Sequence, residues 1–401
     1  MPLYLTRVLG GTALSIGIIE GAAEALNSVL KIISGRMSDR WRARKPLMIA
    51  GYAVSSLVRP LVALATTWPH VLLVRLADRV GKGVRGAPRD ALIASWADPA
   101  SRGYAFGVNR AMDHAGAVVG PLLATAFLWF FPEQFRLLFA LTLIPGAIAV
   151  LMLLPVPDIP PPGSAGSPNA DGIRVSGFGI RPHHAERPAV GSFGTGGGDF
   201  PSTALRAGSP GASLGSPFYR YLSVLLLFSL GNSTDAFLLL RLNELGIGAT
   251  WIPLVWAALH VVKAVASPIG GRLSDRMSRK VIITSGWAIY AGVYAGFAVV
   301  SSLPALVAVF LVYGLYYGLT EGVEKAVVAD LVPENSRGYA FGVYSAVVGI
   351  GALCASLLFG GIWKFAGAPA AFMTGAGIAL VSAVLLTRLR LPHPITVGPR
   401  S

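Results

Sequence analysis

The hexapeptide Gly35-Arg36-Met37-Ser38-Asp39-Arg40 returns later in the chain as Gly271-Arg272-Leu273-Ser274-Asp275-Arg276, 236 residues further on. A longer identity follows it: residues 101–108 (SRGYAFGV) recur without change at 336–343, at an offset of 235. A nearly constant offset over most of each half indicates an internal duplication. The repeated motif therefore divides the chain into two related halves.

The composition places both halves in a membrane. The 401 residues are 54% hydrophobic and 13% charged, whereas soluble domains are about 25% charged. Apolar runs reach the roughly 20 residues that a helix needs to cross a bilayer, and they do not alternate as β-barrel strands do. A soluble enzyme, a disordered chain and, with one cysteine, a disulfide scaffold are excluded. We expect an all-α polytopic protein with eleven full spans, near 12–35, 46–67, 70–95, 103–130, 136–155, 218–243, 250–271, 280–301, 304–330, 338–363 and 370–388.

Basic residues gather in the loops after the two motif copies and in the C-terminal tail. The opposite loops, such as 66–69, 246–250 and 301–304, contain no Lys or Arg. By the positive-inside rule the basic loops and the C-terminus are cytoplasmic, so we expect a multi-pass protein of the cytoplasmic membrane. The net charge of +14 is then a topology signal rather than a sign of nucleic-acid binding. Because both motif copies lie on one side, the repeats are parallel.

The expected organisation is an N-terminal bundle (1–156), a linker (157–217), a C-terminal bundle (218–390) and a tail (391–401). The linker is rich in Gly, Pro and Ser, without hydrophobic periodicity, so we expect it to be flexible and cytoplasmic. The repeat offset pairs Met1 with Phe237, deep inside the span 218–243. We therefore expect a truncated first helix. The alternative is a first half with five native helices.

The repeated motif has residues suited to a contact between helices. Gly35 and Asp39 are four residues apart and share a helix face, and glycine allows a neighbouring helix to pack closely. The carboxylate can accept hydrogen bonds from the N-terminus of an adjacent helix or pair with a loop arginine. We interpret the motif as a latch that forms in one arrangement of the bundle and breaks in another, and ordinary loop solvation is the alternative. The latch candidates are Gly35, Asp39, Arg40, Gly271, Asp275 and Arg276.

This duplicated Gly-x-x-x-Asp-Arg motif, followed by basic residues in two linked halves, resembles that of the major facilitator superfamily (MFS) of secondary transporters. The resemblance covers nearly the whole chain apart from the linker and the missing first helix. It implies two pseudo-symmetric six-helix bundles that rock around a central cavity, with Asp39 and Asp275 in a cytoplasmic latch. The chain departs from the family pattern at Arg42 and Ala43, and at Ser278 in a second loop that is one residue shorter.

Five charged residues follow one stripe of the span 70–95, in steps of three, four, three and four: Arg75, Asp78, Lys82, Arg85 and Arg89. Such a stripe covers about 21 Å of helix and is too costly to face lipid, so we expect it to line the cavity or partner helices. It hints at an anionic or zwitterionic solute. At the repeat offset, Arg89 and Asp90 correspond to Glu324 and Lys325 with opposite charges. We predict a gate between the halves there, with Arg89 against Glu324, and the alternative is a purely structural ion network.

Other polar residues in the spans are further candidates for solute binding or proton coupling. Burial raises the pKa of a carboxyl group, and histidine as a residue type titrates near neutral pH, so both can carry protons. A structural interhelical bond is the alternative for each of them. Arg75 also resembles the arginine of the superfamily's fourth-helix motif, which is linked to proton coupling, with Asp78 as the group that it tunes. His260 and Lys263 form another polar patch. The remaining candidates are Glu20, Glu24, Asp113, His114, Asp235, Tyr313 and Tyr317.

Gly116-x-x-x-Gly120-Pro121 resembles the fifth-helix motif associated with antiporters of the superfamily. The glycines permit close helix packing and the proline can kink the helix. The motif favours export.

We detect no enzyme motif, nucleotide-binding loop or metal-ligand spacing, and we expect no cofactor. We therefore expect a monomer in the lipid bilayer that moves a small organic solute by alternating access, coupled to protons and directed outward. The alternatives are an importer or facilitator of the same fold, and a non-transporting receptor or inactive truncated paralogue.

Overall fold

The computed structural model describes residues 13–41, 44–158, 214–248 and 251–391, with side chains from residue 26 onward. Within these ranges the chain is helical and contains no strand. Most of the predicted linker, nearly all of the tail, and residues 1–12, on which the expected truncation of the first helix depends, lie outside the described residues. The all-α fold class is confirmed.

The first half contains α2 (Ala13–Trp41), α3 (Lys45–Val58), η1 (Arg59–Leu64), α4 (Trp68–Trp96), η2 (Pro99–Ser101), α5 (Arg102–Phe130), α6 (Phe135–Leu141) and α7 (Leu143–Leu153). The second half contains α8 (Ser216–Gly231), α9 (Ala236–Glu244), α10 (Ile252–Arg276), α11 (Arg279–Val299), α12 (Leu303–Leu331), η3 (Glu334–Ser336) and α13 (Arg337–Arg388). The bounds of α4 and α12 differ by 235 residues at both ends, and so do those of η2 and η3. The duplication is therefore visible in the helix boundaries.

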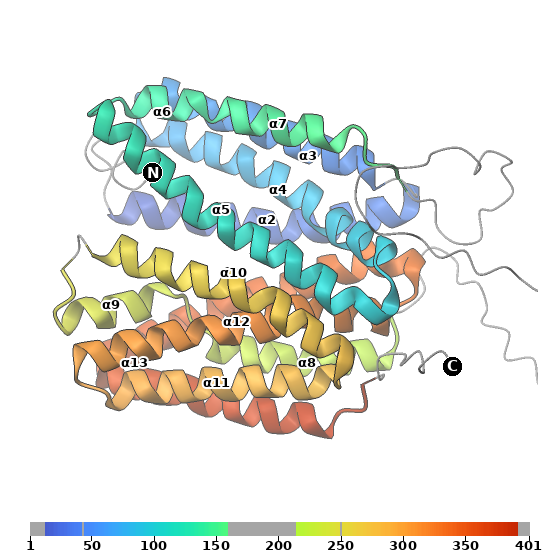
Figure 1. Ribbon diagram of the computed structural model, residues 1–401, viewed down its shortest axis with the longest axis vertical. Coiled ribbons are helices and arrows are strands. Elements are labelled where there is room, and N and C mark those ends of the chain that lie inside the picture. The colour runs from blue at the N-terminus through green and yellow to red at the C-terminus, as the bar shows by residue number, and fades with distance from the viewer. Residues whose placement is uncertain (1–12, 42–43, 159–213, 249–250, 392–401) are drawn as a thin grey trace, which may run out of the picture.

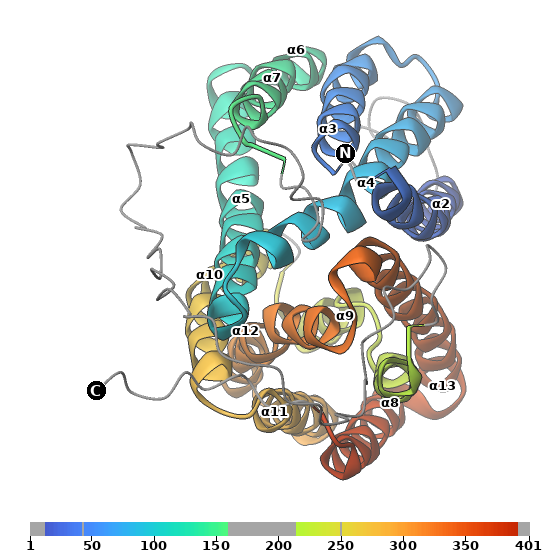
Figure 2. The same ribbon diagram turned by 90° about the vertical axis from the view of Figure 1, so that its right-hand side faces the viewer.

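The two halves lie side by side as bundles, with α5 against α10 and α2 against α13 along their interface (Figures 1 and 2). The helices α2, α4, α10 and α12 finish at one end of the molecule, where α5 and α13 begin. We call this end the basic end, because the arginines of both motif copies lie there.

The last two predicted spans lie within α13, which reverses its direction at Gly367. This residue has a φ of 85°, which glycine adopts readily because it has no Cβ. The rings of Phe359 and Phe372 lie 5.0 Å apart, although thirteen residues of straight helix would separate them by about 20 Å. The two arms of α13 therefore pack against each other.

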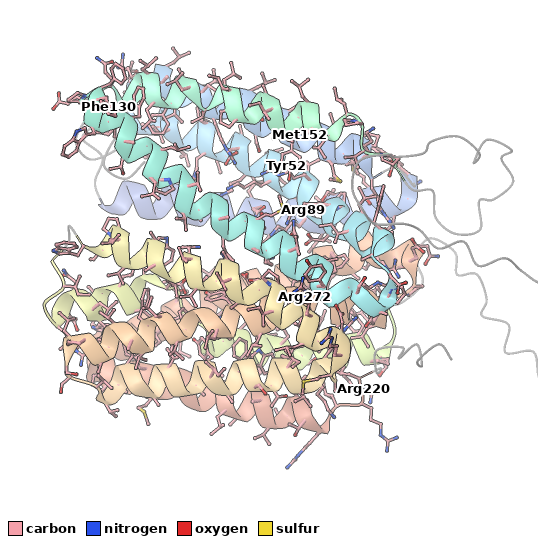
Figure 3. All side chains as sticks on the ribbon, viewed as in Figure 1. Tyr52, Arg89, Phe130, Met152, Arg220 and Arg272 are labelled. Carbon is pink, nitrogen blue, oxygen red and sulfur yellow. The ribbon has the colours of Figure 1, made fainter. Side chains whose placement is uncertain are left out.

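Eight helical segments among the described residues are long and apolar enough to cross a membrane. Large apolar side chains cover their outer surface: Phe130 is 76% exposed and Met152 is 71% exposed, and both lie at the periphery of the bundle (Figure 3). Because such an apolar surface is favourable only against lipid, the outer face of the bundles fits a bilayer.

Candidate functional site

The first motif copy, on α2, binds the beginning of α13 in the opposite half. The Asp39 carboxylate accepts hydrogen bonds from the backbone amides of Gly338 (2.9 Å) and Tyr339 (2.7 Å). These amides belong to the first turn of a helix, where N–H groups lack helical partners and the dipole favours a negative charge. The helices cross so closely that a Cβ on Gly35 would lie 2.1 Å from the carbonyl oxygen of Gly338. We call this contact latch 1.

The second motif copy, on α10, makes the same contact in the reverse direction. The Asp275 carboxylate accepts hydrogen bonds from the amides of Gly103 (2.8 Å) and Tyr104 (2.7 Å), in the first turn of α5. A Cβ on Gly271 would lie 2.3 Å from the carbonyl oxygen of Gly103. This contact is latch 2, and each half therefore supplies one carboxylate and one helix start.

The arginines that take part in the latches are not the predicted ones. Arg40 and Arg276 are exposed, because they lie beyond the helix crossings. Instead, the guanidinium of Arg36 lies 4.4 Å from the ring centroid of Tyr339 and donates a hydrogen bond to its hydroxyl group (3.2 Å). Arg272 lies 4.5 Å from the ring of Tyr104 and donates to its hydroxyl group (3.1 Å). Within the described residues, the arginine next to each glycine therefore replaces the predicted one.

A second layer of arginines, which was not among the predicted residues, supports each latch. At latch 2, Asp330 accepts hydrogen bonds from both Arg102 (2.9 Å) and Arg279. The signal in the sequence was Arg102, which stands with its counterpart Arg337 in the repeated octapeptide.

At latch 1, the residue equivalent to Asp330 is Ser95, 235 positions earlier. Its hydroxyl group accepts hydrogen bonds from Arg44 (2.5 Å) and Arg337 (3.4 Å), and Arg44 also donates to the carbonyl oxygen of Glu334 (3.1 Å). A hydroxyl group thus stands at latch 1 where a carboxylate stands at latch 2.

The predicted gate lies further inside the bundle, and the structure forms only one of its cross-pairs. Lys325 of α12 donates to Asp90 of α4 across the halves. Glu324 instead accepts hydrogen bonds from Trp287 (3.3 Å) and Tyr344 (2.9 Å) in its own half. The predicted contact between Arg89 and Glu324 is not formed in this conformation, because adjacent helix positions point about 100° apart and Glu324 faces the core of the second half.

Arg89 itself lies in the first half, near its boundary with the second (Figure 3), and forms ion pairs with Asp90 (3.3 Å) and Asp113 (3.8 Å), both in the first half. Arg110 also pairs with Asp113 (3.2 Å). These contacts hold the charges of α4 and α5 together near the interface.

The other charged residues of the α4 stripe bind mainly to partners in the first half. Asp78 pairs with Arg59 of η1 (2.8 Å) and with Lys82 (3.8 Å). Arg85 donates to Ser55 of α3 (2.8 Å). Arg75 is half-buried, about one turn from Asp78. Asp78 and Arg85 are therefore turned towards α3 and η1 rather than towards the second half.

A polar cluster lies at mid-depth in the second half, where the helix is interrupted between α8 and α9. Asp235, at this break, accepts hydrogen bonds from the hydroxyl groups of Tyr313 (2.8 Å) and Tyr317 (3.0 Å). Lys263 of α10 approaches the same carboxylate at 3.4 Å. Three predicted candidates are thus brought together, and Lys263 completes the cluster.

His114 of α5 connects the first half to this region. Its Nδ1 lies 3.2 Å from Nδ1 of His260, and its Nε2 lies 3.0 Å from Oε2 of Glu321. Glu321 was not identified in the sequence, although it is an ionisable residue inside a predicted span, which was the available signal.

The remaining predictions concern α2 and α5. Glu20 and Glu24 fall on α2, but their side chains lie outside the described residues. Gly116 and Gly120 were expected to pack against another helix, yet a Cβ on either would meet no described atom within 4 Å. Within the described residues this stretch of α5, with Pro121, lies on the exposed side of the bundle, so the packing role stays a prediction.

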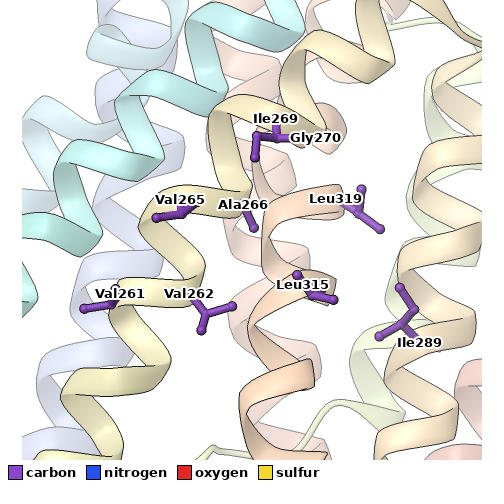
Figure 4. A pocket seen from close by; sticks show the side chains of 9 residues that line it. All are labelled: Val261, Val262, Val265, Ala266, Ile269, Gly270, Ile289, Leu315 and Leu319. Atoms are coloured by element: carbon purple, nitrogen blue, oxygen red, sulfur yellow. The ribbon is translucent and has the colours of Figure 1, made fainter.

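The described residues contain no group of three or more His, Cys, Asp or Glu that could hold a metal ion. A hollow of about 450 Å³ lies between α10, α11 and α12, and only aliphatic residues and glycine line it (Figure 4). With no polar group to orient a polar solute, this hollow is not the candidate site.

Comparisons with known proteins agree with this architecture. The family model of the Major Facilitator Superfamily matches residues 1–320 and 221–400. An uncharacterised MFS-type transporter of Methanocaldococcus jannaschii is 31% identical over 392 residues, which cover 96% of this chain and 88% of the relative. A hexuronate transporter of Bacillus subtilis is 24% identical over 95% of this chain and 87% of its own length.

The multidrug resistance protein MdtH of Photorhabdus laumondii is 31% identical, over only 33% of this chain and 32% of its own length. The crystal structure of the human organic anion transporter MFSD10 has the same fold, with a TM-score of 0.67 at 18% identity, over 92% of this chain and 83% of that one. The matched family model and these relatives show that this chain belongs to the major facilitator superfamily of membrane transporters.

Proposed function

We propose that this protein exports a small organic solute across the cytoplasmic membrane by alternating access, in exchange for protons. The two latches carry this proposal, because the same carboxylate-to-helix contact joins the halves twice at the basic end. Alternating access requires contacts between repeats that form at one end in one state and break in the other. With the basic end on the cytoplasmic side, this conformation is closed to the cytoplasm.

The contact between His114 and His260 supports proton coupling. Two Nδ1 atoms at 3.2 Å share a hydrogen bond only if one donates and the other accepts, so at least one ring is neutral. Protonation of both rings removes the acceptor and places two positive charges together. An imidazole can both donate and accept a proton, and Glu321, bound to the other side of His114, offers a nearby proton acceptor.

The likeness of one third of the chain to MdtH supports export, as does the resemblance of the sequence around Gly120 to the antiporter motif. The lack of a packed neighbour at Gly116 and Gly120 among the described residues leaves this motif as support from sequence alone.

The proposal can be tested in proteoliposomes that contain the pH indicator pyranine. Glucuronate and ethidium serve as an organic anion and an organic cation. We expect one of them to cause proton movement that depends on the protein and to be driven by an imposed pH gradient. A His114→Asn variant should lose the effect of the gradient but retain solute exchange, and His70→Asn, which changes an exposed histidine, is the matched control. Solute movement that ignores the pH gradient would instead indicate a facilitator.

A further inference from the structure

The ammonium group of Lys263 lies in a cage of aromatic rings at mid-depth in the second half. Its Nζ is 3.4 Å from the ring centroid of Tyr317, 5.6 Å from that of Trp256 and 5.7 Å from that of Tyr313. The Lys263 side chain is only 3% exposed. Rings within about 6 Å of a cation attract it through their electron-rich faces, and proteins that bind organic ammonium ions use this arrangement.

A carboxylate closes the cage. Asp235 Oδ1 accepts two tyrosine hydroxyl groups, and Oδ2 faces the Lys263 ammonium at 3.4 Å. This distance is longer than the 2.7–2.9 Å of a close charge-assisted hydrogen bond. The two tyrosines orient the carboxylate independently of Lys263, so the negative charge stays in place when the cation changes. The aromatic rings and the carboxylate therefore form the cage without a contribution from Lys263.

We propose that the cage of Trp256, Tyr313, Tyr317 and Asp235 binds the ammonium group of an organic cation, and that Lys263 is its intramolecular occupant in this structure. The inference rests on the proposed transport function in one respect, since it names the class of solute that would be carried. The cation would displace the ammonium of Lys263, whose flexible four-carbon chain allows it to leave the rings.

Two neighbours make this exchange possible without an isolated charge. Glu321, on the same helix as Tyr317, is close enough to Lys263 to interact with it electrostatically. His260 packs edge-on against Trp256, with ring centroids 4.9 Å apart. The cage therefore lies beside the histidine pair. A cation in the cage and a proton on the histidine pair would repel each other, so the two would compete.

The test empties the cage and refills it. In Lys263→Ala, n-propylammonium replaces the missing atoms Cγ to Nζ, and we expect millimolar concentrations to raise Tm by about 3 °C. The controls are n-propanol, of equal size but uncharged, and propionate, of opposite charge. Lys280→Ala is the matched variant, because Lys280 binds the backbone carbonyl groups of Thr387 (3.0 Å) and Leu389 (3.3 Å) and does not belong to the cage. An equal shift with n-propanol, or none with n-propylammonium, would overturn the proposal.

A second variant covers the case in which Lys263→Ala does not fold. Lys263→Met keeps the volume of the side chain and removes its charge, so tetraethylammonium should bind about tenfold more tightly to it than to the wild type. Binding that is unchanged or weaker would also overturn the proposal. Should tetraethylammonium bind while the wild-type protein moves no solute in proteoliposomes, the cage would stand and the transport function would fall.

Discussion

Latch 1 and latch 2 share their front layer and differ in the layer behind it. In both, a carboxylate binds the first turn of a helix from the opposite half, a glycine permits the close crossing, and an arginine stacks on a tyrosine. Behind latch 2, Asp330 receives two arginines. Behind latch 1, Ser95 receives two arginines without a full negative charge at that position.

This difference teaches that duplication preserved the geometry but not the strength of the contact. A buried guanidinium needs a counter-charge, and a hydroxyl group provides only a partial one. Latch 2 therefore holds a compact ion network around Asp330. At latch 1, Ser95 shares the two arginines with Glu334, which binds Arg44 through its carbonyl oxygen and pairs with Arg337 through its carboxylate at 3.6 Å. We expect latch 1 to open before latch 2.

We expect the largest difference between the two latches from Asp330→Asn, which leaves Arg102 and Arg279 without their shared counter-charge. Loss of one partner from a buried ion pair costs about 3–5 kcal/mol, so latch 2 should open. Spin labels at the exposed positions 40 and 276, in a Cys354→Ser background, should report longer distances by double electron–electron resonance. Ser95→Ala is the equivalent change in latch 1 and should have a smaller effect. An unchanged distance distribution in Asp330→Asn would refute the role of the carboxylate.

The glycine crossings should be nearly as sensitive in both latches. An added Cβ at Gly35 or Gly271 would overlap a carbonyl oxygen of the partner helix, and overpacking of this kind costs about 1–3 kcal/mol. We expect Gly35→Ala and Gly271→Ala to lower Tm and to favour the form that is open at the basic end. Gly116→Ala provides the control, since its Cβ would meet no described atom within 4 Å. Equal Tm values for all three variants would show that the crossings are not tight.

The comparison is sharpened by Ser95→Asp, which gives latch 1 the acid that latch 2 has. A carboxylate between Arg44 and Arg337 should stabilise the closed form by about 1 kcal/mol after its desolvation. We expect a higher Tm, shorter label distances and slower solute exchange, because the basic end must open in every cycle. Faster exchange in this variant would contradict the expectation that a stronger latch 1 slows the opening of the basic end.

The smallest effect should come from the stacked arginines, and it should be the same on both sides. Exposed cation–π contacts contribute about 0.5–1 kcal/mol, so Arg36→Gln and Arg272→Gln should each lower Tm by only a few degrees. Thermal unfolding of the two variants under one set of conditions tests this symmetry. A clearly larger loss for one of them would place part of the asymmetry in the front layer.

The helical fold and the two halves could be predicted from the sequence, because long apolar runs and a fixed repeat offset can be recognised without a structure. It also indicated Gly35 and Asp39, since four-residue spacing defines a helix face. It could not indicate that Glu324 turns into its own half while Lys325 crosses to Asp90, because helix rotation is set by packing. For the same reason the spacing of the α4 stripe predicts one surface, whereas Arg85 donates a hydrogen bond to Ser55 of α3.

The course of α5 connects latch 2 with the centre of the bundle. This helix begins at latch 2, where Asp275 holds its first turn, and twelve residues later it carries His114, which is about 18 Å along a stiff rod. Displacement of its first turn must therefore shift the imidazole against His260. Opening of latch 2 and movement of the histidine pair are thus coupled through α5. The equivalent position on α13 is Gly349, which has no side chain to transmit such a displacement. Among the described residues, the link between a latch and an imidazole at the centre of the bundle is therefore a feature of α5 that has no counterpart at the equivalent position of α13.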